Sequence, residues 1–560
     1  MWRTVVETGE SHRVTRPGVV VRQASWGPAS VVAFTTDRDG DEKTRTFLIK
    51  MGRSVEPVGH IELVGPHVRQ VLPERPCWSR DGTTLFFSAN DRSVENFDVL
   101  AYHLSTRKVR RLTEHPGTLE PTSLSPDGSL LLALDQVSNT HIGSAIIEVG
   151  PRRLHRPRAL NVEGRTCYPV GWAGNSESFL LVENIRSDTT RLALYDLDSE
   201  SLEPLSGIPE GVVEDAVPTP DGAILFSINL DGESFLFRRS SEGQIARIAM
   251  PPGVMRYLTM SLDGSRAATL WDTATAPMNV HTIDLRTGNV RQMTTNRPRR
   301  KEVTCEPPRV IRYESFDRMI PAFLYRNPDF YGPSPLVISI HGGPNLQERP
   351  GYNYGGFYQY LLSQGVAVLA PNIRGSTGYG LKYQRLLNGR WGLDDVCDIE
   401  AAVAWLRHQD WVDSNRVALF GTSYGGFLAL SCLARSPGIY RLGAVVAAPT
   451  NLATLLEHAP PGWGAAVAES LGVVTRDQEM LFARSPMARV ENITAPVFFV
   501  QGGRDPRVAP RDGDEFVARL RQSGGLVECI QLEDEGHGIF KPKNIQSVFI
   551  RLAHFLLKHL

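Results

Sequence analysis

The sequence is poor in cysteine and has no long hydrophobic run. Six cysteines in 560 residues are scattered without close spacing, which argues against a disulfide framework or a zinc ribbon. No stretch of about 18 uncharged apolar residues occurs, so no membrane span is expected. The first residues lack the apolar core of a secretory signal. We therefore expect a cytoplasmic protein.

An excess of basic residues is also missing. Lys and Arg number 60 against 61 Asp and Glu, for a net charge of −1, whereas a nucleic-acid-binding protein usually carries a basic excess or a basic patch. One short basic run, at residues 297–301, suits a solvated linker. The partner expected is a peptide or an acylated small-molecule substrate, with neither nucleic acid nor membrane, and self-association into a homo-oligomer stays open.

A turn signal recurs through the first 300 residues. A turn rich in Ser, Pro, Asp and Gly precedes an apolar strand, as at residues 78–82 and 124–128. Numbered by first residue, the signals begin at 26, 78, 124, 172, 218 and 260. A period of about 40–50 residues is typical of β-propeller blades. We predict an all-β propeller of six or seven blades over residues 1–300, with an irregular all-β domain as the alternative.

Beyond residue 300, strands alternate with helices. Mostly apolar runs at 336–340, 365–370, 417–420, 444–447 and 497–500 predict buried parallel strands. Amphipathic segments such as 398–408 lie between them. This alternation is typical of a doubly wound α/β domain, which we expect over residues 301–560.

The sharpest chemical signal is Gly-Thr-Ser-Tyr-Gly-Gly at residues 421–426. An apolar strand leads into this motif and a helical segment, 427–435, follows it. A strand, a tight turn with small flanking residues and a helix form the nucleophile elbow that exposes a serine at the carboxyl end of a sheet. Ser423 is therefore the predicted nucleophile. The alternative is a glycine-rich turn that serves packing alone.

A base and an acid are needed to activate Ser423, and the expected chain order is Ser, then Asp or Glu, then His. Asp505 follows the strand at 497–500, and His537 follows a predicted last strand at 526–532. We predict that Ser423, His537 and Asp505 form a catalytic triad. The rivals considered are Asp512, Asp514 and Asp534 for the acid, and His458, His554 and His559 for the base.

Acyl transfer also needs donors aimed at the tetrahedral oxyanion. One candidate is the backbone N–H of Tyr424, directly after the nucleophile. The second is the backbone N–H of Gly343, in the sequence Ile-His-Gly-Gly-Pro at residues 340–344 that follows an earlier strand. Paired glycines let a backbone approach the substrate closely, although a simple strand-to-helix turn would also explain them.

Together these motifs resemble the prolyl oligopeptidase family of serine peptidases, and its acylaminoacyl-peptidase-like branch most closely. The landmarks are residues 341–344, 372–380, 421–426, 505–508 and 536–538. The resemblance implies a propeller covering an α/β-hydrolase catalytic domain, with the same three triad residues. It also implies that Arg507 helps to hold the substrate backbone. A plain surface salt bridge is the alternative for this arginine.

The same resemblance implies a pocket lined by residues 448–452 and 460–463, with Trp463 on its wall; ordinary core packing is the alternative for Trp463. His341 stands where prolyl oligopeptidases proper have an oxyanion tyrosine, which favours the acylaminoacyl-like branch. No paired-glutamate motif of the dipeptidyl-peptidase kind is found. Recognition of a free amino terminus is therefore not predicted.

The predicted function is a serine hydrolase that cleaves short peptides or N-acylated peptides through an acyl-enzyme, with neither metal nor organic cofactor. An esterase or a biosynthetic amide hydrolase with the same triad is one alternative, because a fold does not determine its substrate. The other is a non-catalytic interaction protein that binds partners through its propeller.

Overall fold

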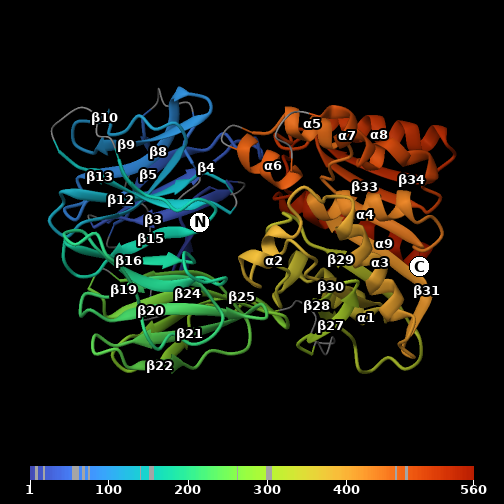
Figure 1. The fold of residues 1–560 in the computed structure, drawn as a ribbon, viewed down its shortest axis with the longest axis horizontal. Helices are drawn as coiled ribbons and strands as arrows, with labels where there is room; N and C mark the ends of the chain where they lie inside the picture. Colours follow the sequence, from blue (N-terminus) through green and yellow to red (C-terminus); the bar gives the residue numbers. More distant parts are fainter. Residues whose placement is uncertain are drawn as a thin grey trace.

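The computed structural model describes all residues except 5, 7–9, 17–18, 29, 53–61, 66–69, 73–75, 139, 151–156, 262, 298–305, 461–462 and 473–476. Figure 1 shows two parts side by side: β-sheets from the N-terminal half, coloured blue to green, and an α/β part coloured yellow to red. The expected linker at 297–301 and the predicted boundary at 300/301 fall on or beside the undescribed residues 298–305. Among the residues that the structure describes, no helix has the length and apolar character needed to cross a membrane.

Antiparallel meanders build the N-terminal part, which is propeller-like. In the described residues, four sheets have four strands each, in the orders β3-β4-β5-β6, β15-β16-β17-β18, β19-β20-β21-β22 and β23-β24-β25-β26. An eight-stranded sheet joins the meanders β7–β10 and β11–β14 through one parallel pairing, Thr118 with Phe97. A separate hairpin pairs β1 with β2.

The bounds of these strands are β1 Trp2–Thr4, β2 Ser11–Arg13, β3 Val21–Trp26, β4 Val31–Thr36, β5 Arg45–Lys50, β6 Glu62–Leu63, β7 Cys77–Trp78, β8 Thr84–Ser93, β9 Asn96–His103, β10 Lys108–Arg111, β11 Thr118–Leu124, β12 Leu130–Gln136, β13 Ile142–Glu148, β14 Arg158–Leu160, β15 Cys167–Trp172, β16 Ser178–Glu183, β17 Arg191–Asp196, β18 Leu202–Pro204, β19 Val212–Pro218, β20 Ile224–Leu230, β21 Glu233–Arg239, β22 Ile245–Ile248, β23 Val254–Met260, β24 Arg266–Thr273, β25 Ala276–Asp284 and β26 Val290–Gln292.

The recurring turn signal lies between the first and second strands of the meanders. In one copy Ser79 Oγ donates to Asp81 at 2.6 Å, and the backbone N–H of Thr84 donates to Ser79 Oγ at 2.9 Å. Gly82 supplies the positive φ, +70°, that the turn needs. The signals that begin at Trp26 and Trp172 coincide with the ends of β3 and β15. The repeat in the sequence is therefore a repeat of turn chemistry.

An eight-stranded sheet with the order β27-β28-β30-β29-β31-β32-β33-β34 forms the centre of the C-terminal part. From β30 onward its neighbours are parallel, and β27 and β28 pair antiparallel at one edge. The strand bounds are β27 Arg309–Ser315, β28 Arg318–Tyr325, β29 Ser334–Ile340, β30 Ala367–Pro371, β31 Val412–Thr422, β32 Leu442–Val446, β33 Val497–Gly502 and β34 Val527–Leu532. This is the α/β-hydrolase architecture that the resemblance implied.

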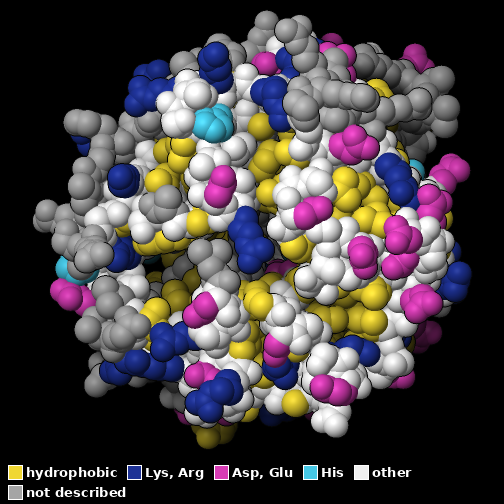
Figure 2. All heavy atoms as spheres, turned by 90° about the vertical axis from the view of Figure 1, so that its left-hand side faces the viewer, with side chains coloured by type: hydrophobic (Ala, Val, Ile, Leu, Met, Phe, Trp, Pro, Cys, Tyr) yellow, Lys and Arg dark blue, Asp and Glu magenta, His cyan; other side chains and the backbone are white. Residues whose placement is uncertain are grey.

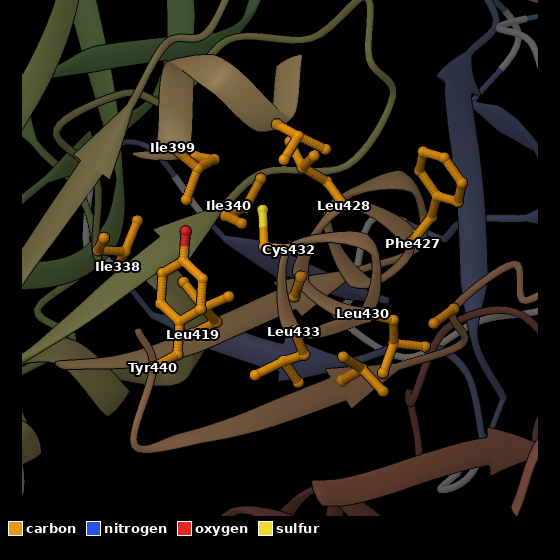
Figure 3. Packing of buried hydrophobic residues seen from close by; sticks show 14 of the residues in the cluster. Ile338, Ile340, Ile399, Leu419, Phe427, Leu428, Leu430, Cys432, Leu433 and Tyr440 are labelled. Carbon is orange, nitrogen blue, oxygen red and sulfur yellow. The ribbon is translucent and has the colours of Figure 1, made fainter. Parts of the chain in front are cut away.

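Helices cover both faces of this sheet. Their bounds are η1 Asn353–Gly355, α1 Phe357–Ser363, α2 Leu381–Arg385, α3 Asp394–Leu406, α4 Tyr424–Arg435, α5 Leu452–Glu457, α6 Gly464–Leu471, α7 Gln478–Ala483, η2 Pro486–Asn492, α8 Pro510–Gln522 and α9 Pro542–His559. Side chains of α3, α4 and α8 share one hydrophobic core with the sheet, and those of α1 and α9 share another on the opposite face. Figure 3 shows Leu428, Cys432 and Leu433 of α4 among the apolar side chains of the first core. Helix α4, which follows the predicted nucleophile, is thus packed into the hydrophobic core.

Polar contacts join the two parts. Arg349 donates to the carbonyl of Gly232 at 2.8 Å and pairs with Glu214, while Arg312 pairs with Asp231 at 2.7 Å. Figure 2, which views the molecule from the propeller side, shows described side chains of both signs on that face, with Asp and Glu more frequent on the right of the view. This distribution agrees with the near-zero net charge of the chain.

Candidate active site

Ser423 occupies a sharp turn between β31 and α4. Its backbone has φ +58° and ψ −124°, a conformation that costs a non-glycine residue about 1–3 kcal/mol. The turn needs small neighbours: a Cβ added to Gly425 would lie 2.1 Å from the carbonyl oxygen of Ile340. The predicted strand, turn and helix are therefore present, and α4 begins at Tyr424, three residues before the predicted 427.

Three strand ends bring Ser423, His537 and Asp505 together. His537 Nε2 lies 2.9 Å from Ser423 Oγ, and His537 Nδ1 lies 2.8 Å from Asp505 Oδ2. Because a carboxylate only accepts hydrogen bonds, the ring proton belongs on Nδ1, and Nε2 is left to accept from the serine hydroxyl. The Asp505 side chain is fully buried and that of His537 is 12% exposed. The cluster is thus a continuous hydrogen-bond chain whose imidazole is slightly exposed while its carboxylate is fully buried.

Backbone donors fix the Asp505 carboxylate. Its Oδ1 accepts from the N–H groups of Arg507 at 2.9 Å and Val508 at 3.0 Å, and Gln501 Nε2 lies 3.3 Å from Oδ2. These donors hold Oδ2 toward the imidazole. The orientation of Asp505 is therefore set by its own loop.

The rival acids and bases bind elsewhere. Asp512 pairs with Thr454, Asp514 is exposed on α8, and Asp534 pairs with Lys541. His458 contacts the backbone of Thr454 and the Arg511 side chain, whereas His554 and His559 lie on α9. The contacts described for these six residues do not include Ser423.

The glycine loop after β29 lies against the nucleophile turn. A Cβ added to Gly342 would lie 3.2 Å from the carbonyl oxygen of Thr422 and 3.6 Å from Ser423 Cβ. Gly343 has φ +117°, a left-handed value that favours glycine. As the first residue of α4, Tyr424 has an N–H with no partner inside the helix. Both predicted oxyanion donors therefore belong to segments that flank Ser423.

Tyr424 is anchored by its side chain. Its hydroxyl donates to Asp395 Oδ2 at 2.7 Å, and its ring packs edge-on against Trp391 with centroids 4.6 Å apart. Burial raises the pKa of Asp395 to about 6, although hydrogen bonds from Gly392, Tyr424 and Val396 favour its ionised form. Because the ring points into the core, Tyr424 presents its backbone N–H, and not its side chain, at the nucleophile turn.

The motif at 372–380 packs against the glycine loop at 341–344 and is hydrogen-bonded to it. His341 is buried, and its Nε2 lies 2.9 Å from Ser376 Oγ. Asn372 accepts from the N–H of Glu348 at 2.7 Å. Arg374 makes a bidentate ion pair with the fully buried Asp398, at 2.9 and 2.7 Å. Two of the landmark motifs thus support each other through buried polar contacts.

Arg507 and Trp463, which the resemblance placed separately at the substrate site, lie in contact with each other. The guanidinium lies 4.3 Å from the centroid of the Trp463 ring, and Arg507 Nε donates to Glu42 Oε2 at 2.9 Å. Trp463 is 45% exposed, so core packing does not account for it. Pro461 and Gly462, predicted beside it, lie outside the described residues.

Glu42 and Asp395 were missed by sequence reasoning. Asp395 sits in an Asp-Asp pair at the start of α3, where it could have been taken for an ordinary first-turn acid. Glu42 lies 465 residues before its partner Arg507, and nothing local in the sequence connects them.

This fold and site define a class of protein. A serine on a nucleophile elbow, at the carboxyl end of a mostly parallel sheet and hydrogen-bonded to an imidazole, is the arrangement of a serine hydrolase with the α/β-hydrolase fold.

Comparisons with known proteins narrow the class to a family. Residues 353–560 match the model of the prolyl oligopeptidase family. Dipeptidyl aminopeptidase BIII from Pseudoxanthomonas mexicana is 29% identical over 559 residues, which span 94% of this chain and 78% of that protein. Acylamino-acid-releasing enzyme 2 from Oryza sativa subsp. japonica is 27% identical over 235 residues, 40% of this chain and 30% of that protein.

Solved structures share the fold over the whole length. A puromycin hydrolase superposes with a TM-score of 0.85 at 22% identity, covering 99% of this chain and 89% of that one. Residues 353–560 are a prolyl oligopeptidase family domain, and the protein is a serine peptidase. The family resemblance drawn from the motifs is confirmed.

Proposed function

We propose that the protein hydrolyses short peptides or N-acylated peptides through an acyl-enzyme formed on Ser423. The observation that carries this proposal is the hydrogen-bond chain from Ser423 through His537 to Asp505, at 2.9 and 2.8 Å. A serine hydroxyl is a weak nucleophile until a base takes its proton. In this proposal His537 is that base, and Asp505 holds its tautomer and stabilises the imidazolium.

The reaction has two halves. Ser423 Oγ bonds to the substrate carbonyl carbon while its proton moves to His537 Nε2, and the carbonyl electron pair moves onto oxygen. The N–H groups of Tyr424 and Gly343 are the proposed donors to that oxyanion. Collapse breaks the C–N bond, and Nε2 returns the proton to the leaving amine. Water repeats the sequence to release the acid.

The substrate-binding part of the proposal concerns Arg507 and Trp463. The guanidinium would donate to a substrate carbonyl, and the indole would form an apolar wall. The half-exposed Trp463 beneath a stacked guanidinium supports this role. Two relatives are named for releasing dipeptides and acylamino acids, which agrees with short substrates.

The proposal also covers the architecture. Counting the eight-stranded sheet as two blades gives six four-stranded blades. We take the domain boundary to fall at residues 300/301, so that 1–300 is the propeller and 301–560 the catalytic domain. The cytoplasm remains the proposed location.

A fluorophosphonate probe, which attacks an activated serine, tests the proposal. The wild-type protein should be labelled, and Ser423→Ala should not. Ser431→Ala, two turns further along α4 and bonded to the carbonyl of Phe427, is the matched control and should be labelled like the wild type. Absence of labelling in the wild type would contradict the proposal and favour a binding protein.

Matched substrates then separate the bond types. An acetylated peptide anilide, the same anilide with a free amino terminus, and an ester of the same acyl group would be compared. Turnover of the anilides is expected. Turnover of the ester alone would make the protein an esterase.

A further inference from the structure

A propeller segment contacts both loops that carry the imidazole and the carboxylate. Residues 37–43, here called the clamp segment, lie in the connection between β4 and β5. A Cβ added to Gly40 would lie 2.6 Å from the backbone nitrogen of Gly536, and one added to Gly536 would lie 1.9 Å from the carbonyl oxygen of Gly40. The two backbones therefore touch without room for a side chain, directly before His537.

Gly536 is also packed from the catalytic domain. A Cβ added to Gly502, the last residue of β33, would lie 1.9 Å from the carbonyl oxygen of Gly536. Gly536 is thus held between the end of a core strand and the propeller. If the clamp segment shifted, the backbone at Gly536, directly before His537, would lose or gain room on its propeller side.

Asp39 connects the two loops by charge. Its carboxylate accepts from Arg504 Nη1 at 2.6 Å and from Lys541 Nζ at 2.8 Å. Arg504 precedes Asp505, and Lys541 follows His537 by four residues. One propeller carboxylate therefore bridges the flanks of both functional side chains.

Two further contacts act at the same place. Glu42 of the clamp segment pairs with Arg507, two residues after Asp505. The guanidinium of Arg22 in β3 lies 4.2 Å from the centroid of the Phe540 ring, three residues after His537, and is held by Asp37. Each is a modest interaction, but all of them bear on the same pair of loops.

The loop of His537 has internal restraints as well. The buried Glu535 carboxylate accepts from the N–H of Lys541 at 2.8 Å and from Asn544 Nδ2 at 2.9 Å. These bonds tie the base of the loop to the first turn of α9. The clamp segment contacts the same loop at Gly536 and, through Asp39, at Lys541.

We propose that the clamp segment is a positioning element of the active site: Gly40 and Asp39 hold the loops so that His537 remains within hydrogen-bond reach of Ser423 and Asp505. This rests on the proposed function. The catalytic residues all come from the C-terminal domain, but their alignment depends on a propeller segment. Misplacement by about 1 Å can cost about 10²-fold in rate, so a contact this close to the imidazole has a measurable effect.

Two substitutions in the full-length protein test the proposal. Asp39→Asn removes the bridging charge, and kcat should fall about tenfold with unchanged KM, because two half-exposed ion pairs are weakened. Asp39→Glu should recover most of the loss. Gly40→Ala forces a Cβ against Gly536, and kcat should fall about 10²-fold. The rate of fluorophosphonate labelling should fall in parallel, because it reports serine activation.

The chain offers matched controls for both. Asp231→Asn breaks another ion pair between propeller and catalytic domain, with Arg312, and should leave kcat unchanged. Gly128→Ala places alanine at a similar φ, +78° against +77° at Gly40, with no atom within 4 Å of the added Cβ. Gly128→Ala should also leave kcat unchanged. A loss seen only in Gly40→Ala would then come from the contact with Gly536 and not from backbone strain.

Salt dependence provides a second measurement, made on the wild type and on Asp39→Asn. Raising NaCl from about 0.1 M to about 1 M shortens the Debye length from about 10 Å to about 3 Å. The wild-type kcat should fall with salt, and in Asp39→Asn this dependence should weaken. The positioning role would be overturned if Asp39→Asn and Gly40→Ala both kept the kcat and the labelling rate of the wild type. It would also be overturned if the kcat of the wild type and that of Asp39→Asn depended equally on salt. An unlabelled wild type would instead overturn the proposed function.

Discussion

Exchange of the Asp505 carboxylate for an amide tests the proposed relay with little change in shape. Asp505 Oδ1 accepts from the N–H groups of Arg507 at 2.9 Å and Val508 at 3.0 Å. In Asp505→Asn these two donors would keep the amide oxygen, because an NH₂ group cannot accept from them. The NH₂ group is then directed at His537 Nδ1.

An amide donor at Nδ1 forces the imidazole into the other tautomer. Nδ1 must accept, the ring proton moves to Nε2, and Nε2 can no longer take the proton of Ser423. The kcat should fall about 10⁴-fold, as expected when the wrong tautomer is imposed in a serine triad, which corresponds to about 5 kcal/mol in the activation free energy. The KM should change little, because Asp505 lies behind the imidazole.

Steady-state kinetics on a peptide anilide gives both parameters. Asp514→Asn is the matched control, since Asp514 is exposed on α8 and follows the same strand, β33. It should leave kcat unchanged. A loss smaller than about tenfold in Asp505→Asn, or a loss confined to KM, would refute the relay.

Two further predictions concern buried charges. Burial raises the pKa of Glu348 to about 7, above its ordinary 4.5, so the stability it contributes is full below pH 4.5 and is lost as pH rises through about 7. Glu348→Gln should therefore be more stable than the wild type at pH 8, by up to about 3 kcal/mol, with the difference vanishing near pH 4; identical pH profiles in urea unfolding would contradict this. Arg374→Ala leaves the buried Asp398 carboxylate unpaired and should lower the free energy of unfolding by about 3–5 kcal/mol. Adding Asp398→Asn should recover part of that loss in the same assay, and a loss below about 1 kcal/mol would show that the pair is unimportant.

The catalytic strands were predictable because their signals are local. The run at 497–500 lies inside β33, Val497–Gly502, and the motif at 421–426 spans the end of β31 and the start of α4. In the α/β-hydrolase fold the functional loops follow the strand ends, so chain order and position directly after a strand together pointed to Asp505 and His537. Their side chains lie within hydrogen-bond distance in the structure, at 2.8 Å from Asp505 to His537 and 2.9 Å from His537 to Ser423.

Element boundaries were predicted less well where local propensity and tertiary context disagree. Tyr424, Gly425 and Gly426 are poor helix formers, yet they begin α4 because the elbow turns directly into the helix. β31 begins at Val412, several residues before its apolar run, because Val412 pairs with Ser334 at the edge of β29. Both differences come from contacts between distant segments.

The contacts of the clamp segment could not be found from sequence for the same reason. Gly40 and Gly536 are, locally, two loop glycines among 50 in the chain. Neither residue has room for a Cβ, because the two backbones touch, and that contact forms only when the propeller packs on the catalytic domain. The proposed division of the chain at residues 300/301 places every proposed catalytic residue in the second part. The contacts of Asp39 and Gly40 reach across that boundary, so a propeller segment is a direct structural neighbour of the loop that carries the imidazole.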